Sequence, residues 1–228
     1  MPHGYRDENN PARWKGKLDR LLPSPAKLKK KKHHEAMSID ETPDFMKTLA
    51  SNESLSAKCL LFLILTATRS NEARGAQWSE IDFESKVWTI PIERMKASKE
   101  HQIPLSHQAM ELLLSMPRII NNPYVFPSTK GKPLSDMSLS MLMRRMNTNA
   151  VPHGFRSTFR DWAGDKTGYP RDLAEAALAH TVSNQVEAAY RRGTALEKRR
   201  KMMQDWGDFI YSQTNKKEVS KIIRLKKA

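Results

Sequence analysis

The sequence lacks the features of a disulfide-linked, metal-rich or membrane-spanning protein. Its single cysteine, Cys59, excludes a disulfide framework and a cysteine-rich metal site, and it is consistent with a reducing cytoplasm. The longest apolar run, residues 59–65, is far too short to cross a bilayer, and we expect no signal peptide. There is no glycine-rich phosphate loop and no cluster of metal ligands, so we expect neither ATP nor a metal or other cofactor.

Acidic side chains are scarce relative to basic ones. Lys and Arg number 39 against 25 Asp and Glu, which gives a net charge of +14. This excess favours a polyanionic partner, with nucleic acid first and an anionic membrane surface second, although a merely soluble basic protein has the same composition. No convincing basic amphipathic helix with exposed aromatic residues is present, so we expect no membrane partner.

Composition divides the chain into three parts. Residues 1–36 are polar, are punctuated by prolines and include a lysine run, so we predict a basic linker or arm. Residues 37–213 carry periodic apolar runs and are predicted to form one domain, followed by a basic tail over 214–228. The lysine run includes Lys29, Lys30, Lys31 and Lys32. It is either a solvated tail or a strap that neutralises nucleic-acid phosphates, and both descriptions can hold together.

The pattern within residues 37–213 is mostly helical. A helix is predicted to begin within residues 38–43, which offer caps and an early proline, and to run to about residue 50. Further helices are predicted over 54–68, 71–77, 106–116, 135–147, 153–166, 170–180 and 194–212. Three short β-like segments, 78–82, 86–91 and 102–105, predict a small antiparallel sheet. The expected fold class is therefore α+β, mostly helical, with one small three-stranded antiparallel sheet.

Two arginines, two histidines and a late tyrosine occur in a fixed order. They are Arg69 in T-A-T-R-S-N-E, His153 and Arg156 in H-G-F-R-S-T-F-R-D-W-A, His180 in A-L-A-H, and Tyr190 in A-A-Y-R-R. A guanidinium group is always charged and forks onto two phosphate oxygens. A tyrosine, with an ordinary pKa of about 10, needs cationic surroundings to act as a nucleophile. The set therefore indicates a site that attacks a phosphodiester.

Each of these residues also has a plain structural interpretation. Arg69 suits a surface ion pair with Glu72, His180 suits the end of a helix, and Tyr190 suits packing at a helix end. His153 and Arg156 lie three residues apart near a helix start, which places both on one face at a terminus that favours phosphate.

The ordered set R…H-x-x-R…H…Y, with its flanking residues, resembles the catalytic core of the tyrosine recombinases, the phage-integrase family. The flanking residues are most similar to the integrases of satellite phages and genomic islands. The resemblance covers roughly residues 37–209 and implies a catalytic domain in a bacterial, cytoplasmic, nucleoid-associated protein. Residues 10–25 resemble the end of the linker after the family's core-binding domain, so we expect the family's N-terminal DNA-binding domains to be missing from this chain.

The resemblance implies that Tyr190 attacks a scissile phosphate, forms a 3′-phosphotyrosyl link and frees a 5′ hydroxyl. It implies that the transition state is stabilised by Arg69, Arg156, His153 and His180, with Glu72 orienting Arg69. A lysine in the connection between the second and third strands gives a proton to the leaving 5′ oxygen, and Lys96 fits that position better than Lys99. The candidate contacts to the DNA backbone are Lys99, Arg160, Arg191, Arg192, Lys29, Lys30, Lys31 and Lys32.

The implied function is strand exchange at double-stranded attachment sites, for the integration and excision of a mobile element. Four protomers act together on DNA, and we expect a monomer in the free protein. Two alternatives remain open. The first is a type IB topoisomerase, which uses a similar residue set but relaxes supercoils. The second is a truncated fragment that binds DNA without cutting it.

Overall fold

The computed structural model describes residues 10, 12–22, 35–96, 98–180 and 195–212. The chain divides into two compact units, residues 1–33 and 34–228. In the first unit, the segment Trp14–Leu18 is interrupted at Lys15 and Gly16 and leads into α1 (Asp19–Leu21). Neither stretch contains a buried residue, so this part of the chain contributes no core of its own.

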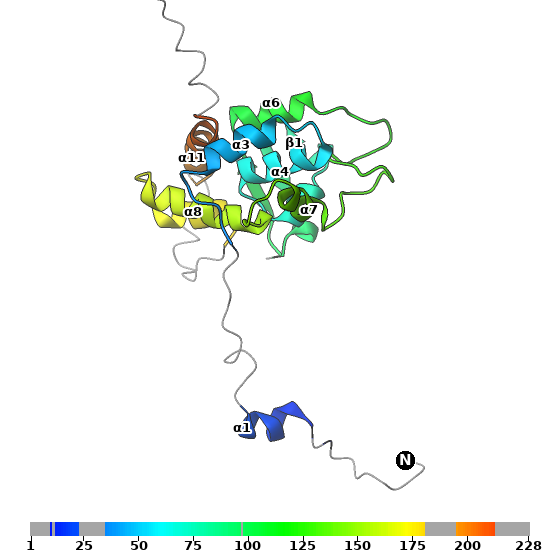
Figure 1. The fold of residues 1–228 in the computed structure, drawn as a ribbon, viewed down its shortest axis with the longest axis vertical. Helices are drawn as coiled ribbons and strands as arrows, with labels where there is room; N and C mark the ends of the chain where they lie inside the picture. Colours follow the sequence, from blue (N-terminus) through cyan, green and yellow to red (C-terminus); the bar gives the residue numbers. More distant parts are fainter. Residues whose placement is uncertain (1–9, 11, 23–34, 97, 181–194, 213–228) are drawn as a thin grey trace, which may run out of the picture. The chain divides into compact units, whose positions relative to one another are not determined.

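The second unit is mostly helical and contains one small sheet (Figure 1). Its described helices are α3 (Thr42–Ala50), α4 (Leu55–Thr66), α5 (Ser70–Arg74), α6 (His107–Ser115), α7 (Ser138–Arg145), α8 (Phe155–Asp165), α9 (Arg171–Ala177) and α11 (Ala195–Ile210). The strands β1 (Ile81–Asp82), β2 (Val87–Ile90) and β3 (His101–Pro104) form an antiparallel sheet in the order β1-β2-β3. The predicted fold class is confirmed.

Helix α4 is the centre of the core. Its run from Cys59 to Leu65 is buried on all sides, and helices α3, α5, α6, α7 and α11 all contact it. A helix that is apolar all round has no solvent face, so it must be enclosed by other elements. The indole of Trp206 on α11 donates to the carbonyl of Ile64 at 2.8 Å, which ties the last described helix to this centre.

The sheet packs its tryptophan against the central helix. In the β2–β3 ladder, Trp88 lies opposite Ile103, and the Trp88 ring is 4.8 Å from that of Phe62 on α4. The predicted first strand, 78–82, was wrong in its first half, because Trp78–Glu80 forms a 3₁₀ turn and only Ile81–Asp82 pairs. The Glu80 carboxylate accepts from the backbone of Gln77 at 3.1 Å and from the Trp88 indole at 3.0 Å, which stabilises the turn.

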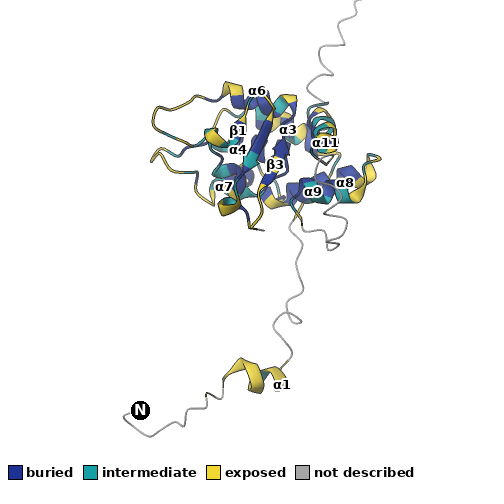
Figure 2. Cartoon of the chain, turned by 180° about the vertical axis from the view of Figure 1, so that it is seen from behind, coloured by how far each residue is buried: buried dark blue, intermediate teal, exposed yellow. Residues whose placement is uncertain are grey.

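The helix predicted over 153–166 is divided in two. A 3₁₀ turn, Pro152–Gly154, precedes α8. Figure 2 shows α8 and α9 beside α11, with the buried faces in dark blue. Aromatic rings hold α8 to α11, with Phe159 edge-on to Trp206 at 5.4 Å and Trp162 at 5.1 Å from the same ring. The residues that begin α8 are thereby held on the core.

Gly154 allows the start of the second unit to pass close to the turn before α8. A Cβ at this position would lie 2.2 Å from the Glu35 carbonyl oxygen, which is backbone and has little freedom to move. Val151 donates to that oxygen at 3.0 Å, and the Thr158 hydroxyl donates to the Met37 carbonyl at 2.7 Å. Residues 35–37 therefore run against the turn that contains His153.

We expect Gly154→Ala to lower the free energy of unfolding by about 1–3 kcal/mol, because the new methyl group displaces residues 35–36. Gly164→Ala in α8 is the matched control. A Cβ there meets nothing within 4 Å, and alanine favours helix, so this change should raise stability by about 0.5 kcal/mol. Urea titration of both variants measures the two effects. Equal stabilities would contradict the close approach.

Candidate active site

Arg156 joins the ends of two helices that are far apart in the sequence. Its side chain projects from the first turn of α8 and is only 4% exposed. Nη1 donates to the carbonyl of Ala67 at 2.7 Å, and Nη2 donates to the carbonyl of Leu178 at 2.6 Å. Because both acceptors are backbone atoms at helix ends, the guanidinium group is held in one orientation by the fold itself.

The end of α4 turns the chain sharply into the segment that carries Arg69. Thr68 donates its N–H to the Leu63 carbonyl, and Ala67 donates to the Ile64 carbonyl, both at 3.3 Å. Ala67 has a φ of 51°. This pair of bonds around a left-handed residue is a Schellman motif. An alanine in this region costs on the order of 1 kcal/mol, so the turn stores some strain beside the site.

The end of α9 has the same geometry. His180 donates its N–H to the Glu175 carbonyl at 3.0 Å, Ala179 donates to the Ala176 carbonyl at 3.2 Å, and Ala179 has a φ of 49°. The prediction that His180 itself ends a helix over 170–180 was wrong, because α9 ends at Ala177 and His180 lies beyond the left-handed turn. That turn carries the imidazole back toward the helix end.

His180 lies between an arginine and a carboxylate. Arg156 Nη2 is 3.0 Å from His180 Nε2, and His180 Nδ1 is 2.5 Å from Glu175 Oε2. A guanidinium group can only donate, so Nε2 is the acceptor and the proton lies on Nδ1, which donates to Glu175. Glu175 is therefore a site residue that the sequence analysis missed. In the sequence, nothing distinguishes this glutamate, five residues before His180, from other carboxylates on the surface of a helix.

Arg69 is oriented by Glu72, as the sequence analysis expected. The Glu72 carboxylate, which is 3% exposed, accepts from the Arg69 backbone N–H and from Arg69 Nη1, each at 2.8 Å. Arg69 directly precedes α5, so the same carboxylate also satisfies an amide at the start of that helix. The same contact between Arg69 and Glu72 is therefore the predicted ion pair and the means by which Glu72 can orient Arg69.

Arg69 lies close enough to Arg156 for its positive charge to affect the pKa of Arg156. Burial, followed by the nearby positive charge of Arg69, lowers the pKa of Arg156 to about 10, while Glu72 and Glu175 oppose this shift. Arg156 remains charged at neutral pH. Among the described residues, no carboxylate forms an ion pair with Arg156, whose bonds go to two carbonyls and an imidazole. This pair of cations is suited to an anion with several acceptor oxygens.

The connection between β2 and β3 is hydrogen-bonded to α5, the helix that begins directly after Arg69. Arg94 Nη2 donates to the Glu72 carbonyl at 2.6 Å, and Arg94 Nη1 pairs with the Glu80 carboxylate. Lys96 and Lys99 follow in the same connection, and both are exposed. Arg94 was also missed by the sequence analysis, since one arginine in a basic hairpin carries no distinguishing signal.

The remaining predicted residues are placed differently. His153 is exposed in the 3₁₀ turn before α8, while Arg156, three residues on, is buried. Arg160 is about half exposed, with Nε 3.8 Å from the Asp161 carboxylate. Seven predicted residues lie outside the described residues, namely Tyr190, Arg191, Arg192, Lys29, Lys30, Lys31 and Lys32.

Two described tyrosines are poorly suited to act as nucleophiles. Tyr169 donates its hydroxyl to Asp205 at 2.6 Å, and burial together with this carboxylate raises its pKa. Burial and the charge of Glu111 raise the pKa of Tyr211. A nucleophilic phenol needs the opposite shift. Tyr190 is therefore a better candidate for the nucleophile than Tyr169 or Tyr211.

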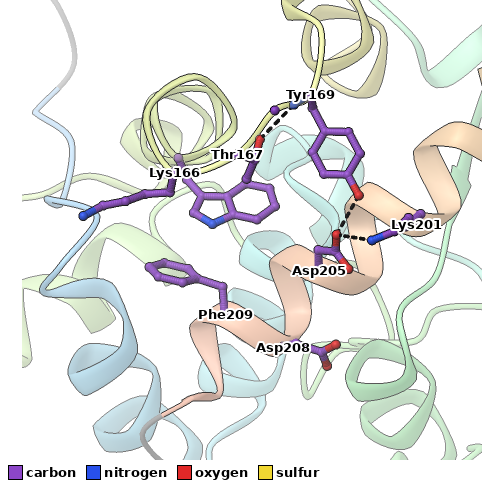
Figure 3. A pocket seen from close by; sticks show the side chains of 9 residues that line it. Lys166, Thr167, Tyr169, Lys201, Asp205, Asp208 and Phe209 are labelled. Carbon is purple, nitrogen blue, oxygen red and sulfur yellow. Dashed lines mark hydrogen bonds and ion pairs between the residues drawn. The ribbon is translucent and has the colours of Figure 1, made fainter.

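Tyr169 belongs to an open hollow between the end of α8 and α11 (Figure 3). The labelled side chains include Lys201, which donates to Asp205 at 2.7 Å, and Phe209 on the same helix. None of the predicted site residues lines this hollow. Within the described ranges, no group of three or more histidine, cysteine or acidic side chains is placed to hold a metal, and no helix has the length and apolar character needed to cross a membrane.

His101 is a further buried residue beside the site. It is 8% exposed, and its Nε2 is 3.1 Å from the carbonyl of Ala177 at the end of α9. A carbonyl only accepts, so Nε2 carries the proton. Burial, together with the positive charge of Arg199, lowers the pKa of His101 to about 4, so the ring is neutral at neutral pH.

This depressed pKa makes folding sensitive to acid. The unfolded chain takes up a proton at this histidine below about pH 6.5, while the folded chain resists it down to about 4. Stability is therefore full above the unfolded pKa and falls as the pH drops from about 6.5 to about 4, with a loss of about 2 kcal/mol at pH 5. Urea unfolding at pH 7.5 and pH 5 measures this loss. In His101→Gln, the part of the stability loss that comes from this histidine should disappear. An equal loss of unfolding free energy between pH 7.5 and pH 5 in the wild type and this variant would contradict the lowered pKa of His101.

The sequence is similar to those of known integrases. A model of the phage integrase family matches residues 35–197. Prophage integrase IntA of Escherichia coli (strain K12) is 37% identical over 187 residues, which are 79% of this chain and 45% of that protein. The chain spans about half the length of the curated relatives it matches.

Solved structures share the fold. A lambda integrase(75-356) dimer bound to a COC′ core site has a TM-score of 0.53 at 19% identity, over 68% of this chain and 60% of that chain. A lambda integrase tetramer bound to a Holliday junction has a TM-score of 0.52 at 18% identity, over 69% and 50%. Since the family model covers more than half of the sequence, the chain belongs to the phage integrase family.

Proposed function

We propose that this chain is the catalytic part of a site-specific DNA recombinase that integrates and excises a mobile element. The observation that carries the proposal is the Arg69–Arg156 pair, with a buried guanidinium that has no carboxylate partner among the described residues and a histidine bonded to it. Membership of the phage integrase family supports it, as do the similar folds of lambda integrases bound to DNA.

The proposed reaction begins with attack of the Tyr190 hydroxyl on a scissile phosphate. The bond from phosphorus to the 5′ oxygen breaks as the 3′-phosphotyrosyl bond forms, and a 5′ hydroxyl from a partner strand later reverses the step. The energy of the phosphodiester is retained in the covalent link, so neither ATP nor a metal is required. Arg69 and Arg156 neutralise the charge that builds on the equatorial oxygens.

The histidines and a lysine move or hold protons. His180, held by Glu175 at Nδ1 and by Arg156 at Nε2, lies where it contacts the phosphate that Arg156 binds. His153, exposed in the turn before α8, accepts the proton that the Tyr190 hydroxyl loses on attack, or donates a hydrogen bond to the same phosphate. Lys96, exposed in the β2–β3 connection, protonates the leaving 5′ oxygen.

The proposed assembly is a tetramer on two duplexes that forms from free monomers. Residues 37–213 act as the catalytic domain, residues 1–36 as a basic linker and residues 214–228 as a basic tail. The contacts to the DNA backbone come from Lys99, Arg160, Arg191, Arg192, Lys29, Lys30, Lys31 and Lys32. We place the protein in the bacterial cytoplasm with the nucleoid.

A nicked duplex that carries the element's attachment core tests the proposal. The nick lets a short strand diffuse away after cleavage, so the covalent protein–DNA adduct accumulates and is seen on a denaturing gel. Adduct in the presence of EDTA and absence of ATP is the expected result. Salt-sensitive retardation without adduct, both here and in a longer chain that carries the family's N-terminal DNA-binding domains, would instead indicate a protein that only binds DNA. Relaxation of supercoils without strand exchange would indicate a topoisomerase.

A further inference from the structure

We propose that His101 is a positioning residue that holds the end of α9 so that His180 and the Leu178 carbonyl meet Arg156. The proposal rests on the proposed function for its catalytic consequence. Its structural part stands on the contacts of β3, α9 and α8 alone. His101 does not touch the reacting atoms in this arrangement, and its effect passes through the backbone of α9.

The carbonyls at the end of α9 are satisfied partly by a backbone turn and partly by side chains from other elements. A helix leaves its final four carbonyls without partners inside the helix. In the Schellman turn, the Glu175 carbonyl accepts from the amide of His180 and the Ala176 carbonyl accepts from the amide of Ala179. The next carbonyl, that of Ala177, accepts from His101 on β3, at 3.1 Å.

The carbonyl after that completes the series. Leu178 accepts from Arg156 Nη2 at 2.6 Å, and this same nitrogen also donates to His180 Nε2 at 3.0 Å. The His101 contact is thus one residue before the arginine contact and three before the catalytic imidazole. A shift of the Ala177 carbonyl moves both of them relative to the guanidinium group.

The charges around His101 favour a neutral donor there. Arg199 and Arg156 both disfavour a proton on the ring, while Glu72 and the Ala177 carbonyl favour one. A lysine or arginine at this place would add a cation beside two others. A neutral imidazole with its proton on Nε2 satisfies the carbonyl without that repulsion.

Strand β3 also contacts α11, the helix that follows residues 181–194 in the sequence. Arg199 of α11 donates from Nη1 to the carbonyl of Gln102 at 2.8 Å, and α11 packs along β3 and α9 (Figure 2). Adjacent residues of one strand therefore anchor α9 and α11, the two helices that flank the stretch containing Tyr190. Lys96 lies in the connection that leads into this strand.

The test compares His101→Leu with His101→Gln in the 228-residue chain. Leucine fills the space but donates nothing, whereas the glutamine amide can donate to the Ala177 carbonyl. We expect His101→Leu to slow single-turnover adduct formation by about 10- to 100-fold, since small misplacements of reacting groups have effects of this size. DNA affinity should stay within about twofold, and His101→Gln should recover most of the rate.

Ile103→Val is the control for simple loss of core packing. Ile103 lies on the same strand and is 2% exposed, but its apolar side chain has no group that can donate a hydrogen bond to a carbonyl. The variant should lose stability with little change in the cleavage rate. If Ile103→Val and His101→Leu slow cleavage equally, or if His101→Gln does not recover the rate, the positioning role is wrong.

Hydrogen exchange separates this proposal from the proposed function. Exchange at the amides of residues 177–180 should accelerate in His101→Leu and stay near the wild-type rate in His101→Gln and Ile103→Val. Unchanged exchange in His101→Leu overturns the positioning role even if the wild type cleaves DNA. Accelerated exchange in His101→Leu, with no adduct from the wild-type chain or from a longer chain that carries the family's N-terminal DNA-binding domains, supports the anchor and overturns the proposed function.

Discussion

Tyr190→Phe is expected to abolish the covalent protein–DNA adduct. The substitution removes one oxygen, the atom that forms the phosphotyrosyl bond, and leaves the aromatic ring. Adduct formation should fall by about 10⁴-fold or more, to the limit of detection. DNA affinity, measured by retardation at fixed salt, should hardly change, because it depends on the many basic side chains and not on this hydroxyl.

Tyr169→Phe is the matched control. Its hydroxyl donates to Asp205 and faces the hollow beside α11, so its loss should leave the adduct yield unchanged. Persistent adduct in Tyr190→Phe, together with its loss in Tyr169→Phe or in a variant of another tyrosine, would assign the nucleophile elsewhere. Mass spectrometry of the digested adduct identifies the modified residue directly.

Arg156→Lys is expected to slow cleavage by about 10²- to 10⁴-fold, although the positive charge is kept. The guanidinium group donates to Ala67 and Leu178 and to His180 from one rigid plane. An ammonium group is a point charge that cannot span these acceptors and also fork onto a phosphate. Single-turnover adduct formation at saturating protein measures the effect.

Stability must be measured alongside, since the substitution leaves a buried carbonyl without a donor. We expect a loss of about 1–3 kcal/mol in the free energy of unfolding, which still leaves the chain folded at low temperature if its stability is ordinary. Arg144→Lys, exposed in the last turn of α7, is the control and should change neither quantity appreciably. A cleavage rate for Arg156→Lys within a few fold of the wild type would remove Arg156 from the transition state.

Much of the fold was predictable because local pattern and burial agree. The apolar run 59–65 has no polar side, and it becomes the enclosed helix α4. The sheet was predicted from short segments of changed period, and the error at 78–80 arose because Glu80 accepts from a backbone amide and an indole, which favours a turn over a strand. Where this strand begins depends on the contacts of a single side chain, that of Glu80.

The contents of the site were predictable in part. Arg69 with Glu72 is a contact between residues three apart, so the sequence carries it. His180 was predicted as a site residue, but its position after a left-handed turn was not, because alanine at residue 179 gives no sign of that conformation. Arg94 and His101 were missed because their partners lie 22 and 76 residues away. Glu175 was missed because nothing in the sequence distinguishes it from other helix carboxylates.

By itself the sequence determined the fold class and the order of the elements, and it singled out the arginines and histidines as candidates, since these depend on periodicity and on residue types within short stretches. Only the tertiary structure decided how they meet. Arg156 reaches Ala67 across 89 residues, and His101 reaches Ala177 across 76. Such contacts form because core packing brings helix ends together, where buried carbonyls need donors, and no local pattern specifies which side chain will supply them.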